Sequence, residues 1–332
     1  AIGNDLNDHF LTFGFVVFVD VERIVERHVL AFRIAVVDMD RLGDPGDFRS
    51  GLGDSSAILA GDQNMDVGIE FGGNRHRLKL HRLHGQVAEL NAAAVANARV
   101  AADEADRTVL VAGSMGPTGE LIEPLGTLSV AETEDAFAEQ AAGLAAGGAD
   151  IIWIETLSDL REVEAAVRGA RRTTDLPVVA TLSYDTAGRT MMGLTGTEAG
   201  TRLAELGIDG IGANCGANIA DTEAAIADIS AVCGDIPVVS KANAGIPVWK
   251  GATLAYDATP EVLAAHAHRT RMAGASLIGA CCGSTPAHIS MMYRVLAGEI
   301  PAPDIDPPEG TRVDQSAIDP DHHRSGRRRR RR

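Results

Sequence analysis

The chain has 332 residues, of which 45% are hydrophobic and only 4% aromatic, so its core must consist mainly of Ala, Val, Ile and Leu. The formal net charge is −16, and an acidic surface of this kind repels phosphate, which argues against a nucleic-acid partner. The sequence has no apolar run of about 18 residues, no signal-peptide pattern and no regular extracellular cysteine spacing. We therefore expect a cytoplasmic protein without a membrane partner.

Residues 1–70 form an atypical N-terminal segment, in which 13–20, 32–40 and 65–73 are candidate strands. From residue 71 to 299, apolar runs rich in Val and Ile alternate with alanine-rich amphipathic segments. The predicted strands of this region are 108–116, 149–156, 176–184, 208–216, 236–245 and 275–283. The predicted helices are 131–148, 160–173, 196–207 and 259–274. Several of these helices begin at Ser, Thr or Asp and end at Gly, as capped helices do.

Continuous apolar strands alternating with helices indicate a parallel sheet covered on both faces. With two strands from the N-terminal segment, the pattern predicts an α/β fold of the (β/α)8 TIM barrel type. A doubly wound open sheet is the alternative, but no Gly-x-Gly-x-x-Gly phosphate loop opens a helix. Residues 300–332 are proline-rich and then arginine-rich, and we expect a disordered basic tail there.

Three of the four cysteines lie at the ends of apolar strands, in two motifs that each close with a glycine. Cys215 lies in "ANCG", and Cys281 and Cys282 lie in "ACCG". When the last strand is counted as the eighth, these are the sixth and eighth strands, and alternate strands of a barrel point side chains into the same inner layer. Three thiolates with one open position are a ligand set typical of catalytic zinc, so we predict a Zn²⁺ site here. Cys233 is interpreted as a buried core residue.

Zinc on three thiolates carries a net charge of −1, which favours binding a further thiol and releasing its proton. The natural reaction is attack of a substrate thiolate on an activated methyl group. Glu155 ends the strand 149–156, where a carboxylate is costly unless it meets a cation. That cation is either a substrate ammonium group or an arginine of the chain, and the remaining alternative is that Glu155 caps the next helix. Asn214 and Asn243 are candidates for binding substrate or for orienting the loops.

Several motifs resemble the homocysteine S-methyltransferase family, namely "FGGNR", "GSMGPTGELIEPLG", "WIETLSDLREVEAA", "SYDTAGRTMMG", "GANCG" and "ACCGSTPAHI". The resemblance runs from about Phe71 to Leu296 and implies a (β/α)8 barrel. It implies zinc on Cys215, Cys281 and Cys282, with Glu155 binding the amino group of homocysteine. The implied reaction transfers a methyl group from a small donor to homocysteine and gives methionine.

The N-terminal segment departs from the family, which begins with an Asp-Gly-(Ala/Gly)-x-Gly-Thr turn that residues 1–70 lack. Asp20 and Asp38 are the candidates to replace its aspartate. Thr156 stands where betaine enzymes of the vertebrate type carry a tyrosine. A quaternary ammonium donor calls for an aromatic cage, and the candidates are Trp153, Tyr184, Trp249 and Tyr256. The stretch "SYDTAGRTMMGL" is most similar to bacterial betaine-type members and favours betaine over S-methylmethionine.

Two other functions are considered. The missing N-terminal turn suggests a non-catalytic zinc- or thiol-binding barrel. A cysteine-nucleophile hydrolase needs a histidine beside a single thiol, and none flanks Cys215 or Cys281. A homo-oligomer is compatible with the sequence.

Overall fold

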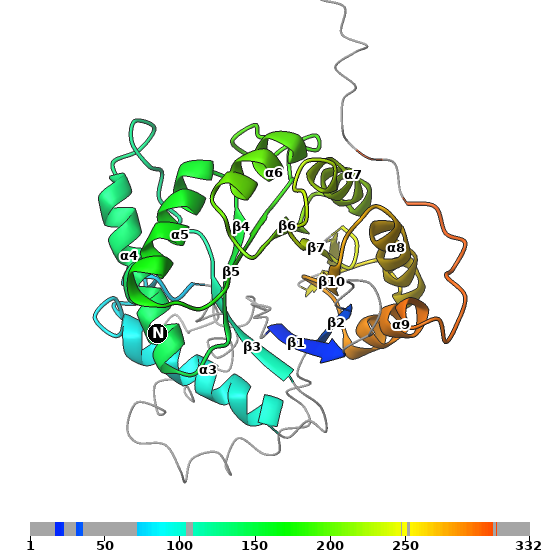
Figure 1. Cartoon of the computed structure of the whole chain (residues 1–332), viewed down its shortest axis with the longest axis horizontal. Helices are drawn as coiled ribbons and strands as arrows, with labels where there is room; N and C mark the ends of the chain where they lie inside the picture. The colour runs from blue at the N-terminus through cyan, green and yellow to red at the C-terminus, as the bar shows by residue number, and fades with distance from the viewer. Residues whose placement is uncertain are drawn as a thin grey trace, which may run out of the picture.

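A computed structural model of the chain describes residues 72–103, 109–246, 256–307 and 310, together with the backbone of 17–22, 31–35, 248–250 and 253–255. Six parallel strands curl around a common axis with helices outside them (Figure 1). In spatial order the strands are β3 (Val109–Met115), β4 (Ile151–Leu157), β5 (Val178–Leu182), β6 (Gly210–Cys215), β7 (Val238–Ala242) and β10 (Leu277–Ala280). This curled sheet confirms the α/β fold but gives six parallel strands, not eight, within the described part of the chain.

The N-terminal segment contributes an antiparallel hairpin to the sheet. β1 (Val17–Glu22) pairs antiparallel with both β2 (Ala31–Ala35) and β3, and β2 comes to lie beside β10 (Figure 1). The two strands fall largely within the candidates 13–20 and 32–40, but the prediction that all strands are parallel is wrong here. Only residues 23–30 join them, and a parallel connection needs about a dozen residues or more. Most of the third candidate, 65–73, lies outside the described residues.

The helices follow the strands in the expected alternation and cover the outer face of the sheet (Figure 1). They are α2 (Arg75–Lys79), α3 (Val87–Asp103), α4 (Val130–Ala146), α5 (Leu160–Thr173), α6 (Gly196–Glu205), α7 (Ile219–Ser230), α8 (Pro260–Met272) and α9 (Pro286–Leu296). A short hairpin, β8 (Val248–Lys250) with β9 (Thr253–Ala255), stands between β7 and α8. Residues 300–307 continue past α9, and the Ile305 carbonyl accepts a hydrogen bond from Arg269 at 2.5 Å. The arginine-rich end lies outside the described residues.

The strands separate two hydrophobic clusters. The larger one joins outward-facing strand residues such as Ile152 and Ile154 to the helices. The smaller one lies inside the curl and contains Ala112, Trp153, Val179, Val239 and Leu277. Because side chains alternate along a strand, the inner face continues toward the carboxyl ends at every second residue. Glu155, Asn214, Lys241 and Cys281 lie on this inner face.

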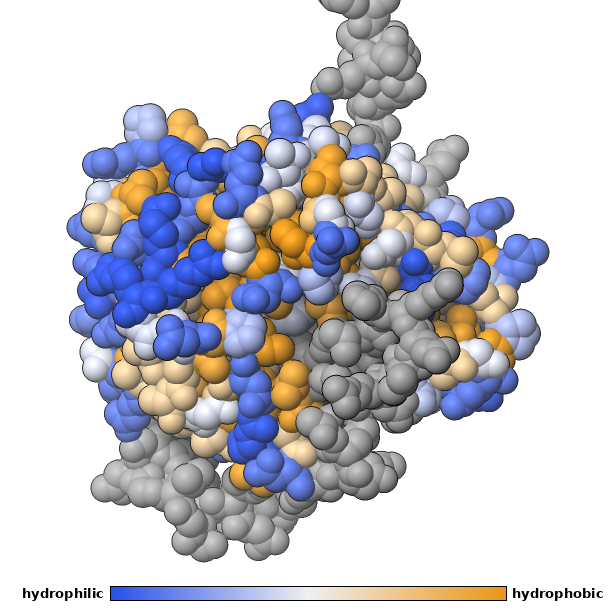
Figure 2. Space-filling view, viewed as in Figure 1, coloured by the Kyte–Doolittle hydropathy of each residue, from blue (hydrophilic) through white to orange (hydrophobic). Residues whose placement is uncertain are grey.

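The outer surface of α4, α5 and α6 carries a series of ion pairs. Arg168 contacts Glu134 at 3.0 Å, and Arg202 contacts Glu164 at 2.8 Å. Figure 2 shows the hydrophilic side chains gathered over α4 and α5. Exposed pairs of this kind add little stability individually, so they mainly keep this face hydrated.

Gly212 on β6 is required by the closeness of the neighbouring strand. A Cβ at this position would lie 1.9 Å from the carbonyl oxygen of Val239. We expect Gly212→Ala to lower the free energy of unfolding by about 3 kcal/mol, because backbone atoms of β7 must move. Gly85→Ala is the matched control, since its Cβ would meet nothing within 4 Å, and its effect should stay within about 0.5 kcal/mol. Urea unfolding of both variants checks this, and equal stability would contradict it.

A buried glutamate holds the loop that follows β3. Oε1 of Glu162 accepts hydrogen bonds from Thr118 N at 2.8 Å and from Thr118 Oγ1 at 2.6 Å. Burial raises the pKa of Glu162 above 4.5, the value expected for an unperturbed glutamate. The folded state therefore holds this proton more tightly than the unfolded state does. The resulting stability is complete below pH 4.5 and is lost as the pH rises through the folded-state pKa.

Glu162→Gln is expected to remove this contribution to the pH dependence while keeping an oxygen acceptor for Thr118. The free energy of unfolding of the wild type, minus that of the variant, should fall as the pH rises from about 4 to 7. Urea titrations at several pH values measure the difference. A difference that rises with pH over this range would contradict the expected sign.

Candidate metal centre

Three cysteines lie together at the carboxyl end of the sheet: Cys215 is the last residue of β6, and Cys281 and Cys282 directly follow β10. Sγ of Cys215 is 3.1 Å from Sγ of Cys281, and the sulfurs of Cys215, Cys281 and Cys282 all lie within 4.8 Å of one another. All three are free thiols. Among the described residues, this is the group of three or more His, Cys, Asp or Glu side chains whose ligand atoms lie close enough together to hold one metal ion. We refer to it below as the cysteine cluster.

Backbone turns bring the sulfurs together. Asn214 faces inward, so an extended chain would point Cys215 outward toward the helices. Cys215 instead has φ of 57° and Gly216 has φ of 84°, and this left-handed turn directs the thiol inward. Gly283 has φ of 78° directly after Cys282. Glycine adopts this conformation without steric cost, which explains why a glycine follows each cysteine motif.

Asn243, just beyond β7, connects the two cysteine turns. Its Oδ1 accepts a hydrogen bond from Cys282 N at 3.1 Å, and its Nδ2 donates to the Gly216 carbonyl at 3.3 Å. The Ala244 N–H donates to the Cys282 carbonyl at 2.8 Å. Because β7 lies between β6 and β10, Asn243 fixes the distance between cysteines that are far apart in sequence.

The cluster suits a tetrahedral metal ion with one position open. Zinc–sulfur bonds of about 2.3 Å place tetrahedral sulfurs about 3.8 Å apart, close to the spacing seen here. Hydrogen bonds from the Cys215 and Cys281 thiols hold the pKa of Cys282 well below its usual range, whereas the pKa of Cys215 is raised by its hydrogen bonds with the other two thiols. The metal-free cluster thus retains protons that a metal would displace, so metal affinity should rise with pH.

Asn214 is buried and spans three strands through its side chain. Its Oδ1 accepts from Thr156 N at 2.9 Å and from Thr181 Oγ1 at 2.7 Å. Its Nδ2 donates to Thr156 Oγ1 at 2.6 Å and lies 3.3 Å from Cys215 Sγ. Thr156 has φ of 64°, a strained value for a β-branched residue, where the β4–β5 register shifts. Asn214 therefore stabilises the turn after Glu155 and also contacts the cluster.

Glu155 meets its cation inside the protein. Lys241 Nζ on β7 lies 2.6 Å from Glu155 Oε2, and Ser114 Oγ donates to Glu155 Oε1 at 2.5 Å. The Lys241 ammonium also lies 4.9 Å from the centre of the Trp153 ring. Burial disfavours the charged form of Lys241, but Glu155 and the nearby Cys281 outweigh it and raise the pKa of Lys241. The sequence analysis expected either a substrate ammonium group or an arginine of the chain beside Glu155. The structure shows a cation of the chain there, but it is the lysine Lys241 and not an arginine.

The aromatic candidates occupy different environments. Trp153 lies inside the curl with Lys241 over its ring, and Tyr184 is 1% exposed and belongs to the cluster between sheet and helices. The ring of Tyr256 lies against Gly283, which directly follows Cys282, and burial and the charge of the Cys282 sulfur raise the pKa of Tyr256. The side chain of Trp249 lies outside the described residues, as do those of Asp20 and Asp38. Tyr256 is thus the aromatic candidate beside the second cysteine turn within the described chain.

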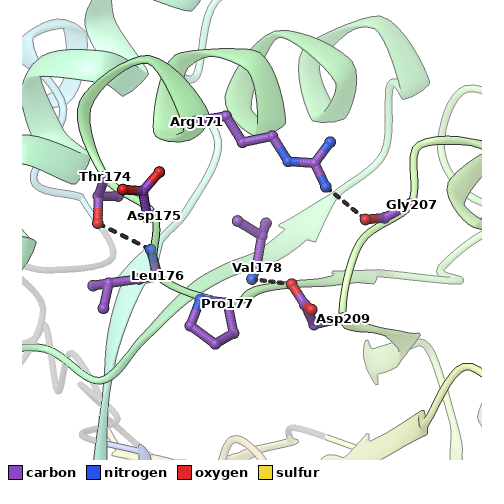
Figure 3. Close-up of a pocket in the computed structure, with 8 residues that line it drawn as sticks. All are labelled: Arg171, Thr174, Asp175, Leu176, Pro177, Val178, Gly207 and Asp209. Carbon is purple, nitrogen blue, oxygen red and sulfur yellow. Dashed lines mark hydrogen bonds between the residues drawn. The ribbon is translucent and has the colours of Figure 1, made fainter.

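A surface recess lies at the opposite end of the sheet (Figure 3). It is lined by Arg171, Asp175, Val178, Gly207 and neighbouring residues, at the start of β5 and just before β6. Arg171 donates to the Gly207 carbonyl at 2.6 Å, and Val178 N donates to Asp209 at 2.8 Å. Cys215, the last residue of β6, lies six positions after Asp209, which corresponds to about 20 Å along the strand. These polar groups bind one another, so the recess is a feature of the loops and not of the cluster.

The sequence analysis did not single out Lys241 or Ser114, although both contact Glu155. The signal for Lys241 was present, because a lysine in the apolar run "IPVVSKA" must be buried if that run is an inner strand. Its spacing from Val239 places both residues on the same face. Ser114 carries no comparable signal, since a serine in a strand is compatible with many environments.

The fold and the site together define a class of protein, a curled α/β barrel sheet with a cluster of three cysteine sulfurs at the carboxyl ends of its strands. Barrel enzymes place their active sites at this end. The family model described as homocysteine S-methyltransferase matches residues 69–296. The chain therefore belongs to the homocysteine S-methyltransferase family.

The chain is also similar in sequence to two methionine synthases. The methionine synthases of Mycobacterium tuberculosis and Mycobacterium leprae are 38% and 35% identical to the chain over 236 and 239 residues. Each match covers 68% of this chain but only 20% and 19% of those proteins, so the chain spans about a fifth of their length.

The homocysteine methyltransferase MmuM from Escherichia coli shares the fold. Its metallated form aligns with a TM-score of 0.54 at 23% identity, covering 67% of this chain and 76% of that one. Its oxidized form gives 0.57 at 21% identity, covering 75% and 91%. Within the residues that the structure describes here, no helix is long and apolar enough to span a membrane.

Proposed function

We propose that the protein transfers a methyl group from a small donor to the thiolate of homocysteine and produces methionine, using zinc bound to Cys215, Cys281 and Cys282. The single observation that carries this proposal is the convergence of the three sulfurs, all within 4.8 Å of one another, at the carboxyl end of the sheet. Family membership supports the same chemistry. Free thiols agree with a reducing compartment, for which the cytoplasm remains our expectation.

Each site residue has a proposed role. Zinc held by the three thiolates would supply an open position for the thiol of homocysteine and would favour loss of its proton near neutral pH. Asn243 keeps the two cysteine turns at ligand distance, and Asn214 supports the Cys215 thiol and the turn after Glu155. Glu155 would bind the substrate ammonium group with the lone pairs that Lys241 and Ser114 leave free, since a carboxylate accepts about four hydrogen bonds.

The remaining substrate contacts belong to the N-terminal segment. We infer that residues upstream of 72 complete the barrel wall around the site, with β1 and β2 as its antiparallel part. Asp20 or Asp38 would then take the place of the family's N-terminal aspartate.

The methyl donor is proposed to be an onium compound, with betaine ahead of S-methylmethionine. Both carry a positive charge on the group that holds the methyl, which suits an acidic protein and an anionic metal site. Tyr256, whose ring lies against Gly283 directly after Cys282, offers an aromatic ring for such a cation. The resemblance of "SYDTAGRTMMGL" to bacterial betaine-type members gives the order of preference.

A donor screen with metal analysis of the same sample tests the proposal. The full chain is incubated with homocysteine and, separately, betaine or S-methylmethionine, and methionine is quantified. We expect about one zinc per chain and methionine formation with at least one donor. A zinc-free preparation that is fully active would overturn the zinc role. Bound zinc without turnover with any donor would favour the non-catalytic thiol-binding barrel.

A further inference from the structure

Lys241 forms an ion pair with Glu155, the proposed contact for the substrate ammonium group. Within the part of the chain whose side chains the structure describes, Lys241 is the one lysine or arginine that is buried. Its ammonium group has three N–H donors. Glu155 Oε2 accepts one of them at 2.6 Å, and the centre of the Trp153 ring lies 4.9 Å from Nζ. Lys241 therefore keeps donor capacity for a ligand on the inner face of the sheet.

The charge balance of this pair favours one kind of substrate. Glu155 and Lys241 carry one negative and one positive charge, which neutralise each other inside the sheet. A substrate with an ammonium group alone would place two cations on one buried carboxylate, and the net positive charge in the interior would be costly. A substrate that also brings a carboxylate to Lys241 keeps the total charge at zero and gives every charge a partner. The pair is therefore suited to a zwitterion.

The position of Lys241 in the sheet agrees with this role. Lys241 lies on β7 and is in register with Asn214 on β6 and with Gly279 on β10, the two strands that lead to the cysteine cluster. Asn243, which contacts both cysteine turns, follows two residues later, a rise of about 7 Å. A thiol bound at the cluster and a carboxylate bound at Lys241 thus suit an amino acid that carries its sulfur on a short aliphatic chain.

We propose that Lys241 binds the carboxylate of the substrate while Glu155 binds its ammonium group. This inference rests on the proposed function and adds a specificity-determining residue to it. The two side chains together select thiols with a zwitterionic amino-acid head over thiols that carry only one of the two charged groups. A lysine that merely neutralised Glu155 would not distinguish ligands by their carboxylate.

The test measures thiol binding by isothermal titration calorimetry, with the full zinc-loaded chain and no methyl donor. Homocysteine is compared with homocysteamine, the analogue that keeps the thiol and the amine but lacks the carboxylate. The wild type should bind homocysteine about 30-fold more tightly than homocysteamine. In Lys241→Met we expect this preference to fall to about threefold or less, because the carboxylate loses its partner and the amine alone neutralises Glu155.

Lys79→Met is the matched control, since it removes an exposed lysine from α2 and should keep the wild-type preference. Lys241→Met leaves a buried carboxylate unpaired, so the double variant Lys241→Met with Glu155→Gln provides a second background without that charge. It should also lose the preference for homocysteine. A wild-type preference retained in either variant would overturn the proposal, as would a wild type that binds both thiols equally well.

Methionine formation by the wild type judges the proposed function separately. A wild type that binds homocysteine but forms no methionine with any donor would contradict that function, while the calorimetric preference would still decide the role of Lys241. Failure of the zinc-loaded wild type to bind homocysteine would overturn both.

Discussion

Replacing Cys282 with alanine is expected to reduce bound zinc from about one ion per chain to almost none, and to lower methionine formation by more than about a hundredfold. The remaining two thiols cannot supply three corners of a tetrahedron, so the open position for the substrate thiol is lost. The fold should persist, because Cys282 lies in a turn beyond β10 and not in either hydrophobic cluster. Metal analysis, a methionine assay and circular dichroism of the same samples measure these outcomes.

Cys233→Ala is the matched control for this substitution. Cys233 is a buried free thiol in the cluster between sheet and helices, with its Sγ 3.6 Å from the Ile236 carbonyl oxygen. Its loss should leave zinc content and turnover unchanged. If Cys282→Ala kept both zinc and activity, the cysteine cluster would not be the metal site.

Lys241→Met is expected to lower the free energy of unfolding by about 3–5 kcal/mol, the range for breaking a buried ion pair. The lysine side chain is 1% exposed and that of Glu155 is 5% exposed, so neither charge can be solvated by water when its partner is lost. Methionine fills a similar volume over Trp153, so the cost arises from the uncompensated carboxylate and not from a cavity. Urea unfolding at neutral pH measures the effect.

The double variant Lys241→Met with Glu155→Gln separates charge from packing. Removing both charges should recover most of the lost stability, to within about 1 kcal/mol of the wild type, because replacing a whole buried pair is often nearly neutral. Substrate binding should not recover, since Glu155 is the proposed ammonium contact. A double variant as unstable as Lys241→Met alone would show that the pair is not the source of the loss.

The sequence was sufficient to predict the parallel part of the fold, because apolar runs and amphipathic helices carry a strong periodic signal. The run 149–156 became β4 at Ile151–Leu157, and the segment 160–173 became α5 with the same bounds. A cysteine or glutamate at the end of a buried strand is also visible in the sequence. Parallel strands bring such ends to one edge of the sheet, so their proximity could be anticipated.

The direction of the N-terminal strands and the local geometry of the site could not be predicted in this way. An apolar run does not indicate whether its strand will pair parallel or antiparallel with its neighbour. The antiparallel hairpin of β1 and β2 was therefore not predicted. Strand spacing also places Cys215 on the wrong face, and only its left-handed turn, at a residue other than glycine, corrects this. The Lys241–Glu155 pair joins residues 86 positions apart across the interior, a contact that no local pattern encodes.

X-ray absorption spectroscopy of the zinc-loaded chain, with and without homocysteine, tests the central claim most directly. The account predicts three sulfur ligands at about 2.3 Å in the free protein and four when homocysteine is present. Fewer than three sulfurs in the free protein, or no added sulfur with homocysteine, would contradict it.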